Sequence, residues 1–268
     1  MRTATVHDIA RLIEQETPPG LAETWDNVGL QVGDGDWSVH KIWVALDATR
    51  TVIDKAVKSR IEMLITHHPL FFRPLKTLDL ATPIGHILEE TVRHHLAVYS
   101  AHTNLDRVKG GVNDILADRL GLHDSIIMDA EQNGEKGGFS RMGILDTPQQ
   151  LKAYVKMLKK TLGLSHIRFS GDPKMAIHKV ALCAGSGSGL LDIFLGSDAD
   201  VFVSGDLKYH DARRIQDYGR GLIDIGHFHS EYLFIEVWMS RLQKSIRRND
   251  FDVIVQQCPV ETDPFTVL

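Results

Sequence analysis

The chain has 268 residues, of which 43% are hydrophobic and 24% charged, which is the composition of an ordinary globular protein. Its formal net charge is -5 and it has no dense run of basic residues, so nucleic-acid binding is disfavoured. Two cysteines without a CxxC motif argue against a disulfide framework or a cysteine-rich zinc site. No signal-peptide core and no run of 18 apolar residues is present, so we expect a cytoplasmic protein without a membrane partner.

Hydrophobic periodicity predicts the elements in chain order. The first is an amphipathic helix at 6–16, which Pro18-Pro19 ends. Short apolar runs of buried-strand length predict strands at 41–46, 62–66, 96–101, 139–145, 166–171, 179–184, 201–205, 222–226 and 251–257. Helices are predicted between them, at 50–59, 83–95, within 106–126, at 148–162, between 184 and 201, between 205 and 222, and at 230–247.

The alternation of strands and helices predicts an α/β fold whose sheets are largely parallel or mixed and are flanked by helices. A chain of this length is expected to form two domains. We place the first domain at 1–126 and the second at 127–268. The helix and strand of 230–268 can dock back on the first domain, so the two domains are expected to be interlinked.

The two halves of the chain resemble each other weakly. A shift of 138 positions sets residues 40–68 against 178–206, strand on strand. A shift of 125 positions sets 98–106 against 223–231, so that His102 meets His227 and Asp106 meets Glu231. Identities are few, and both a duplication and a chance likeness of two strand–helix–strand units stay open.

Metal-binding residue types follow three predicted strands at the point where each strand ends. The strands at 62–66, 96–101 and 222–226 run into His67-His68, into His102 and Asp106, and into His227 and Glu231, respectively. The carboxyl ends of parallel strands share one edge, where ligands collect. Imidazole nitrogens and carboxylate oxygens bind Zn, Mn, Fe, Co and Ni ions, and so many ligands suit two divalent ions better than one.

The alternative is that these are unrelated polar residues at strand ends, and for any single histidine this is the better interpretation. The pair His94-His95 illustrates it, because it precedes a strand and would lie at the opposite edge. Three separate strand ends with histidine or acidic residues favour a common site instead.

Several longer motifs resemble those of the Nif-three-like family, often labelled type 2 GTP cyclohydrolase I homologues. The matching segments run from near one end of the chain to the other and read ETWDNVGLQVGD (23–34), THHPLFF (66–72), SAHTNLD (100–106), SGDLKYHDA (204–212), GHFHSE (226–231) and TDPF (262–265). The resemblance implies two α/β domains with a dinuclear metal site between them and a ring-shaped homohexamer. It places the metal ligands on His67, His68, Asp106, His227 and Glu231, with Glu231 binding both ions. The chain has no room for the mid-chain insertion of some members, so it resembles the compact form.

Other candidate residues surround this ligand set. Asp26, Asn27 and Asn104 are candidates for orienting a ligand or a bound water, or alternatively are turn residues. His102 and His210 are candidate proton-transfer residues, and His210 can equally be a residue at a helix start. The loop after the strand at 179–184 offers backbone N–H groups to a phosphate at Gly185, Gly187 and Gly189, although a plain tight turn also fits.

The sequence therefore predicts a hydrolase that depends on two divalent metal ions, with GTP as the substrate if the family label applies. Hydrolytic attack would then open the purine imidazole ring, and Lys208, Arg73 or the 185–189 loop would bind the triphosphate. The competing hypothesis is a regulatory, metal-handling or protein-interaction protein without turnover.

Overall fold

The computed structural model describes residues 2–130 and 137–267, and it divides the chain into two compact units. The first unit comprises Met1–Val108 and Ile235–Thr262, and the second comprises Lys109–Phe234 and Asp263–Leu268. The boundary at 126 expected from the sequence differs from this division, because the strand at 123–126 pairs with a strand of the second unit. The segment 235–262 belongs to the first unit.

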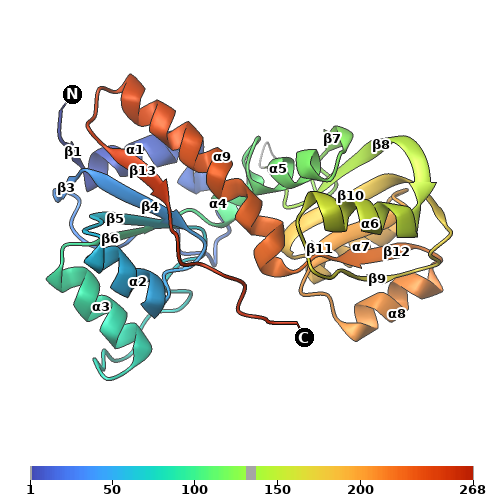
Figure 1. Ribbon diagram of the computed structural model, residues 1–268, viewed down its shortest axis with the longest axis horizontal. Coiled ribbons are helices and arrows are strands. Elements are labelled where there is room, and N and C mark those ends of the chain that lie inside the picture. The colour runs from blue at the N-terminus through green and yellow to red at the C-terminus, as the bar shows by residue number, and fades with distance from the viewer. Residues whose placement is uncertain (1, 131–136, 268) are drawn as a thin grey trace. The chain divides into compact units, whose positions relative to one another are not determined.

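The first unit is built around a five-stranded sheet, with helices on both of its faces (Figure 1). Its elements are β1 (Ala4–Thr5), α1 (Val6–Glu16), η1 (Pro19–Leu21), β2 (Gly29–Val32), β3 (Ser38–Val39), β4 (Lys41–Ala45), α2 (Arg50–Lys58), β5 (Met63–Thr66), α3 (Pro83–Arg93), β6 (Ala97–Ser100), α4 (Thr103–Arg107), the later part of α9 (His227–Arg248) and β13 (Ile254–Gln257). The strand order is β13-β4-β5-β6-β2, and only β2 is antiparallel to its neighbour.

Burial on both faces explains why the strands of this sheet are continuous apolar runs. Every residue of β5 and β6 is buried. Helices α2 and α3 cover one face, where Trp43, Val52, Leu64 and Ile87 belong to one hydrophobic cluster. Helices α1 and α9 lie on the other face (Figure 1). A parallel sheet needs this double covering, so its strands lack the apolar–polar alternation of a half-exposed sheet.

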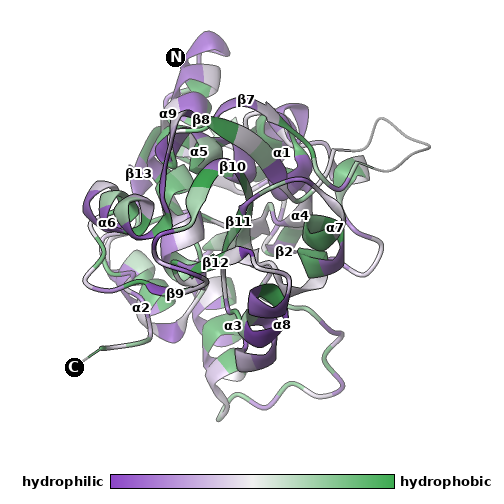
Figure 2. Cartoon of the chain, turned by 90° about the vertical axis from the view of Figure 1, so that its right-hand side faces the viewer, coloured by the Kyte–Doolittle hydropathy of each residue, from purple (hydrophilic) through white to green (hydrophobic). Residues whose placement is uncertain are grey.

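The second unit contains a six-stranded mixed sheet. Its elements are α5 (Val112–Arg119), β7 (His123–Ile126), β8 (Arg141–Gln150), α6 (Leu151–Thr161), β9 (Arg168–Ser170), β10 (Ala176–Ser186), η2 (Ser188–Leu190), α7 (Leu191–Gly196), β11 (Val201–Gly205), α8 (Tyr209–Asp217), β12 (Gly221–Asp224) and the first turns of α9. The strand order is β7-β8-β10-β11-β12-β9. In Figure 2 the apolar parts of β8 and β10 are green and their polar residues are purple.

Only β10, β11 and β12 of this sheet are parallel to one another. β8 pairs with β10 and β9 pairs with β12, both antiparallel, at two separate positions in the sheet. The predicted strands at 139–145 and 166–171 and the helix at 148–162 are therefore present, but the two strands are not neighbours in the sheet. Among the described residues, no helix is both long and apolar enough to cross a membrane.

The parallel strands of the two units follow the same plan. Ile42 pairs with Met63 in the first unit and Val180 with Val201 in the second, so both partners differ by 138 positions (180 − 42 and 201 − 63). The third strands differ by 124 positions, since Met63 pairs with Ala97 and Val201 with Gly221 (221 − 97). The expected shift of 125 is thus one residue too large within the strand.

Candidate metal centre

Three parallel strands of the first unit end at the same level and send polar side chains past the sheet edge. Ala45, Thr66 and Ser100 are partners in the sheet and are the last residues of β4, β5 and β6. Asp47, His68 and His102 each lie two residues beyond them, and His67 precedes His68. The sheet register, not a long loop, therefore brings these side chains to one place.

His67, His68 and His102 form a cluster that can hold a metal ion. The ring centroid of His67 lies 5.0 Å from that of His68 and 5.1 Å from that of His102. The centroids of His68 and His102 are 5.6 Å apart. The His67 side chain is fully buried. His102, expected from the sequence as a catalytic candidate, is thus the third member of the histidine cluster.

The Nδ1 atom of each clustered histidine contacts an oxygen acceptor. His67 Nδ1 lies 3.0 Å from the carbonyl oxygen of Ala101, and His68 Nδ1 lies 3.0 Å from Asp47 Oδ1. His102 Nδ1 lies 3.0 Å from Asp26 Oδ1. Because carbonyl and carboxylate oxygens only accept, each Nδ1 must donate, and in a neutral ring Nε2 then carries the lone pair. Metal-binding histidines commonly have this arrangement.

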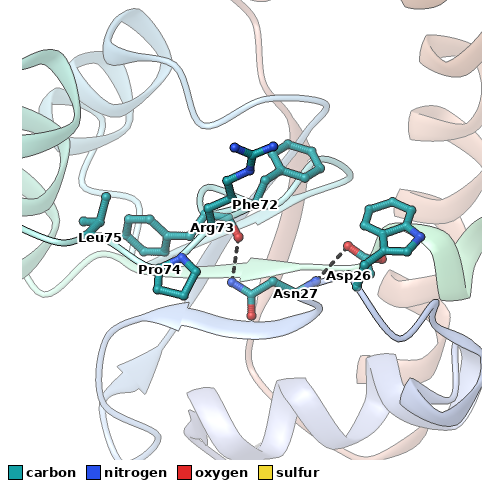
Figure 3. Close-up of a pocket in the computed structure, with 8 residues that line it drawn as sticks. Asp26, Asn27, Phe72, Arg73, Pro74 and Leu75 are labelled. Carbon is teal, nitrogen blue, oxygen red and sulfur yellow. Dashed lines mark hydrogen bonds between the residues drawn. The ribbon is translucent and has the colours of Figure 1, made fainter.

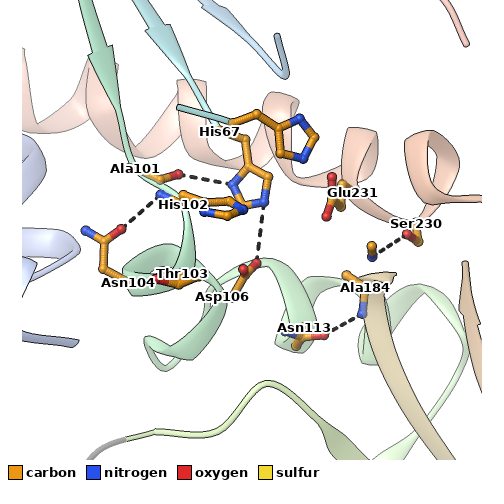
Figure 4. A network of polar contacts seen from close by, with 12 residues as sticks. His67, Ala101, His102, Thr103, Asn104, Asp106, Asn113, Ala184, Ser230 and Glu231 are labelled. Atoms are coloured by element: carbon orange, nitrogen blue, oxygen red, sulfur yellow. Dashed lines mark hydrogen bonds and ion pairs between the residues drawn. The ribbon is translucent and has the colours of Figure 1, made fainter. Parts of the chain in front are cut away.

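Asp106 adds a carboxylate to this cluster. It lies one helical turn after His102, on α4, and its Oδ1 is 3.5 Å from His67 Nε2 (Figure 4). Its side chain is 14% exposed, which leaves it accessible to an ion or to solvent. An imidazole nitrogen and a carboxylate oxygen at this distance suit a shared cation.

Asp26 and Asn104 hold His102 in place. The Asp26 carboxylate has no exposed surface and accepts hydrogen bonds from His102 Nδ1 and from the N–H and hydroxyl of Thr103. Burial by itself would raise the pKa of Asp26, but these hydrogen bonds outweigh it and lower the pKa to about 2. Asn104 Oδ1 accepts a hydrogen bond from the backbone N–H of His102 (Figure 4). The Nδ2 group of Asn104 donates to the carbonyl of Thr17.

Two acidic residues that the sequence analysis did not single out support His68. Asp47 faces His68 Nδ1, and Glu261 accepts hydrogen bonds of 2.8 to 2.9 Å from the backbone N–H groups of Leu46 and Asp47. Burial raises the pKa of Glu261, and the two backbone donors oppose that rise. Asp47 follows a buried strand just as His67 and His102 do, so the same strand-end rule would have found it. Nothing in the sequence pairs Glu261 with it.

The second unit presents a smaller group of the same kind. His227 begins α9 just after β12, and Asp206 follows β11. His227 Nδ1 lies 2.9 Å from Asp206 Oδ2, and His227 Nε2 lies 3.2 Å from Glu231 Oε2 one helical turn later. The Glu231 side chain is only 5% exposed. A nearly buried carboxylate beside an oriented imidazole is a donor set that fits a divalent cation.

The three glycines of the 185–189 loop differ from one another. Gly185 has a φ of +66°, and a Cβ built on it would lie 2.3 Å from Glu231 Oε1, so this position needs glycine for close approach to the carboxylate. Its N–H donates to Ser230 Oγ. A Cβ on Gly187 would lie 2.4 Å from Ser204 Oγ, whereas Gly189 has open space. Phosphate binding by this loop stays a prediction.

The remaining sequence candidates lie near these groups or apart from them. His210 is exposed on α8, where its ring contacts Tyr209. Asn27 Nδ2 donates to Gln31 Oε1 and to the carbonyl of Phe71, so it joins two loops of the first unit. The role of His210 in proton transfer and that of Asn27 in orienting a ligand or water stay predictions.

Comparison with known proteins gives consistent matches along the chain. The model of the Duf34/NIF3 (NGG1p interacting factor 3) family matches residues 4–264. A relative from Clostridium perfringens called "GTP cyclohydrolase 1 type 2 homolog" is 36% identical over 260 residues, covering 97% of this chain and 98% of its own. A Clostridium acetobutylicum protein with the same name is 32% identical, covering 97% of each chain.

Solved structures extend the similarity to the fold. A hypothetical protein of Staphylococcus aureus has a TM-score of 0.91 and 29% identity and covers 100% of both chains. Reduced HcgD from Methanocaldococcus jannaschii has a TM-score of 0.82 and 28% identity, covering 97% of this chain and 99% of its own. Both clostridial relatives align over nearly their whole length, so the chain has the compact size of these relatives.

Replacing Asp26 by Asn is expected to lower the free energy of unfolding by about 2 kcal/mol at pH 7, because the folded pKa lies about two units below the ordinary value of 3.8. A depressed pKa stabilises the fold fully above about pH 4, and this stabilisation is lost as the pH falls through about 2. Urea unfolding of chelator-treated protein between pH 7 and 2 measures it, with Asp36→Asn, an exposed carboxylate, as control. A difference that does not change with pH would exclude the Asp26 charge as its source.

Replacing Gly185 by Ala is expected to destabilise the protein by on the order of 1 to 3 kcal/mol, because the new methyl group meets Glu231 and the backbone φ is positive. The displaced carboxylate should also lower the metal content. Calorimetry and elemental analysis measure the two effects. Gly189→Ala, which adds a methyl group in open space, is the matched control, and equal results for both variants would contradict the close-approach role.

Proposed function

The chain belongs to the Duf34/NIF3 family, and on that premise we propose that it is a hydrolase that depends on two divalent metal ions. The proposed ligands are His67, His68 and Asp106 from the first unit and His227 and Glu231 from the second, with Glu231 binding both ions. The observation that carries the proposal is the orientation of the histidines. The three proposed histidine ligands each have Nδ1 on an oxygen acceptor, which leaves Nε2 available to a metal.

The residues of the chain have distinct roles in this proposal. When bound, a pair of divalent ions supplies a Lewis acid that activates water and polarises the bond under attack. Asp106 and Glu231 contribute negative charge, which offsets the cations in a setting where little solvent reaches Glu231. Asp26 and Asp206 hold the rings of His102 and His227 through Nδ1, so that both rings keep one orientation.

GTP is the substrate we propose, with opening of the purine imidazole ring as the reaction. The support is the name of the clostridial relatives, which describes them as homologues of GTP cyclohydrolase 1 type 2. Arg73 and Lys208 are exposed cations that are candidates for the triphosphate. Hydrolysis at the carbon between two ring nitrogens consumes one water and needs no redox cofactor.

The family description also supports a second candidate function. It names an interacting factor, which favours a metal-handling or protein-interaction role without turnover. The two functions differ in their response to a chelator. An enzyme loses turnover when its metal is removed and regains it on reloading, whereas a metal carrier loses only metal.

Assembly and location form part of the proposal. We propose a homohexamer, which sedimentation analysis of purified protein tests directly. We also propose a cytoplasmic location, which the two buried and unbridged cysteines, Cys183 and Cys258, support.

Protein purified without chelator or metal-affinity resin is expected to contain close to two divalent ions per chain. Glu231→Gln is expected to lower this content strongly, because a carboxylate that binds both ions loses its charge. Elemental analysis measures the content, and Glu236→Gln, an exposed glutamate on the same helix, is the control. Metal content near zero with no uptake on titration would reject the site, and an unchanged Glu231→Gln variant would remove that ligand.

Incubation of the metal-loaded protein with GTP is expected to change the ultraviolet spectrum of the purine, because ring opening destroys the conjugated bicycle. Asp106→Ala is expected to abolish the change, while Asp118→Ala, an exposed acid on α5, keeps it. Release of phosphate with an intact purine spectrum would contradict ring opening and indicate hydrolysis of a phosphoester or anhydride instead.

A further inference from the structure

A pocket of about 450 Å³ lies in the first unit, beside the histidine cluster. Two loops form it, one before β2 and one after β5, and the metal ligands do not account for the aromatic residues that line it. Its lining residues are Trp25, Asp26, Asn27, Phe71, Phe72, Arg73, Pro74 and Leu75 (Figure 3). The volume lies within the range of small-molecule sites.

Two aromatic rings of this pocket meet the same histidine. Trp25 and Phe72 lie 6.1 and 5.7 Å from His102 between ring centroids, both in edge-to-face geometry. Their side chains are nevertheless 58% and 53% exposed. Exposed aromatic faces stack readily on a flat ring.

Hydrogen bonds fix the two loops against each other. Asn27 Nδ2 donates to the carbonyl of Phe71 at 2.8 Å, which joins the loop of Trp25 to the loop of Phe72 (Figure 3). Gln31 Nε2 donates to the carbonyl of Asn27 at 2.9 Å and holds the first loop to β2. The aromatic walls are therefore preorganised, which lowers the entropic cost of binding.

The charges in the pocket favour an anionic group on the ligand. Arg73 is its one cation, is exposed, and makes no hydrogen bond or ion pair with any residue that the structure describes. The Asp26 carboxylate is already engaged by His102 and Thr103 and has no exposed surface, so it does not neutralise Arg73. A guanidinium binds phosphate or carboxylate through parallel hydrogen bonds.

We propose that this pocket binds a planar heteroaromatic ring that carries one anionic group, with Trp25 and Phe72 on the ring and Arg73 on the anion. The contact of both aromatic residues with His102 places such a ring beside the histidine cluster. The inference rests on the proposed function in that it identifies the part of the same centre that selects the substrate. The anion can be a phosphate or a carboxylate, since Arg73 accommodates both.

Calorimetric titration of chelator-treated protein tests this binding without any turnover. The probes are guanosine monophosphate for ring and phosphate together, nicotinate for ring and carboxylate, guanosine for a ring alone, and inorganic phosphate for the anion alone. We expect the first or second probe to bind at least about tenfold more tightly than guanosine and than inorganic phosphate. Their order identifies the anion. No measurable binding of either charged ring compound would overturn the proposal.

Three exposed positions allow variants that keep the fold. Trp25→Leu and Phe72→Leu are each expected to weaken the bound probe about tenfold, from the loss of stacking. Arg73→Gln is expected to weaken the charged probe about tenfold and to leave guanosine unchanged. Tyr218→Leu and Arg60→Gln, an exposed aromatic and an exposed cation outside the pocket, are matched controls with equal melting temperatures expected. Equal affinity in pocket and control variants would overturn the proposal.

The binding experiment and the hydrolase experiment can reject one proposal without rejecting the other. Binding in metal-free protein together with absence of turnover in metal-loaded protein would reject the hydrolase and retain the pocket. Turnover of GTP that is unaffected by Trp25→Leu, Phe72→Leu and Arg73→Gln would retain the hydrolase and reject the pocket.

Discussion

The structure depends on how its histidines are held at the ends of parallel strands. An imidazole offers a metal only one good lone pair, and the hydrogen bond of its other nitrogen decides which atom carries it. The chain meets this requirement four times, with a backbone carbonyl for His67 and carboxylates for His68, His102 and His227. Each acceptor also fixes the ring in a single orientation. The buried charge of Asp26 is acceptable for a similar reason, since four donors face its carboxylate and the hydrogen bonds from His102 and Thr103 keep its pKa low.

The two units place a histidine and an acidic residue after a strand in a similar way. In each, a strand runs into a histidine and an acid follows four residues later on a helix, as His102 with Asp106 and His227 with Glu231. Asp206 stands 138 positions after His68, at the equivalent strand end. Asp206 accepts the hydrogen bond of His227, whereas His68 is itself a candidate metal ligand. The third strands are offset by 124 positions, yet their histidines by 125, because one residue separates the end of β6 from His102 whereas two separate the end of β12 from His227. Gly226, with a φ of +83°, lies in that turn. Equivalent strand ends therefore carry different chemistry.

Sequence patterns predicted the elements and ligands that depend on neighbouring residues along the chain. They did not predict strand pairings or hydrogen bonds that depend on residues far away in the sequence. The buried parallel strands β4, β5, β6 and β11 were predictable, because apolar runs of that length have few alternatives. The edge strands β7 and β9 are exposed. No strand was predicted at β7, and the prediction at 166–171 did not give the partner of β9, because the sheet sets that pairing. At the site, His67 and Asp106 stood out from their strand ends. Glu261, whose acceptor role spans more than 200 residues, gave no local signal.

One turn of the first unit shows why the centre and its pocket are coupled. Trp25, Asp26 and Asn27 are consecutive, and each side chain takes a different direction. Trp25 presents its ring to the pocket, Asp26 is turned inward to His102, and Asn27 braces the loop of Phe71. Any movement of the turn that adjusts the aromatic wall must therefore also shift the acceptor of His102. A ligand that stacks on Trp25 and Phe72 stabilises the same turn that orients the histidine. Because such coupling is reciprocal, we expect occupancy of the histidine cluster to change the affinity of the pocket as well.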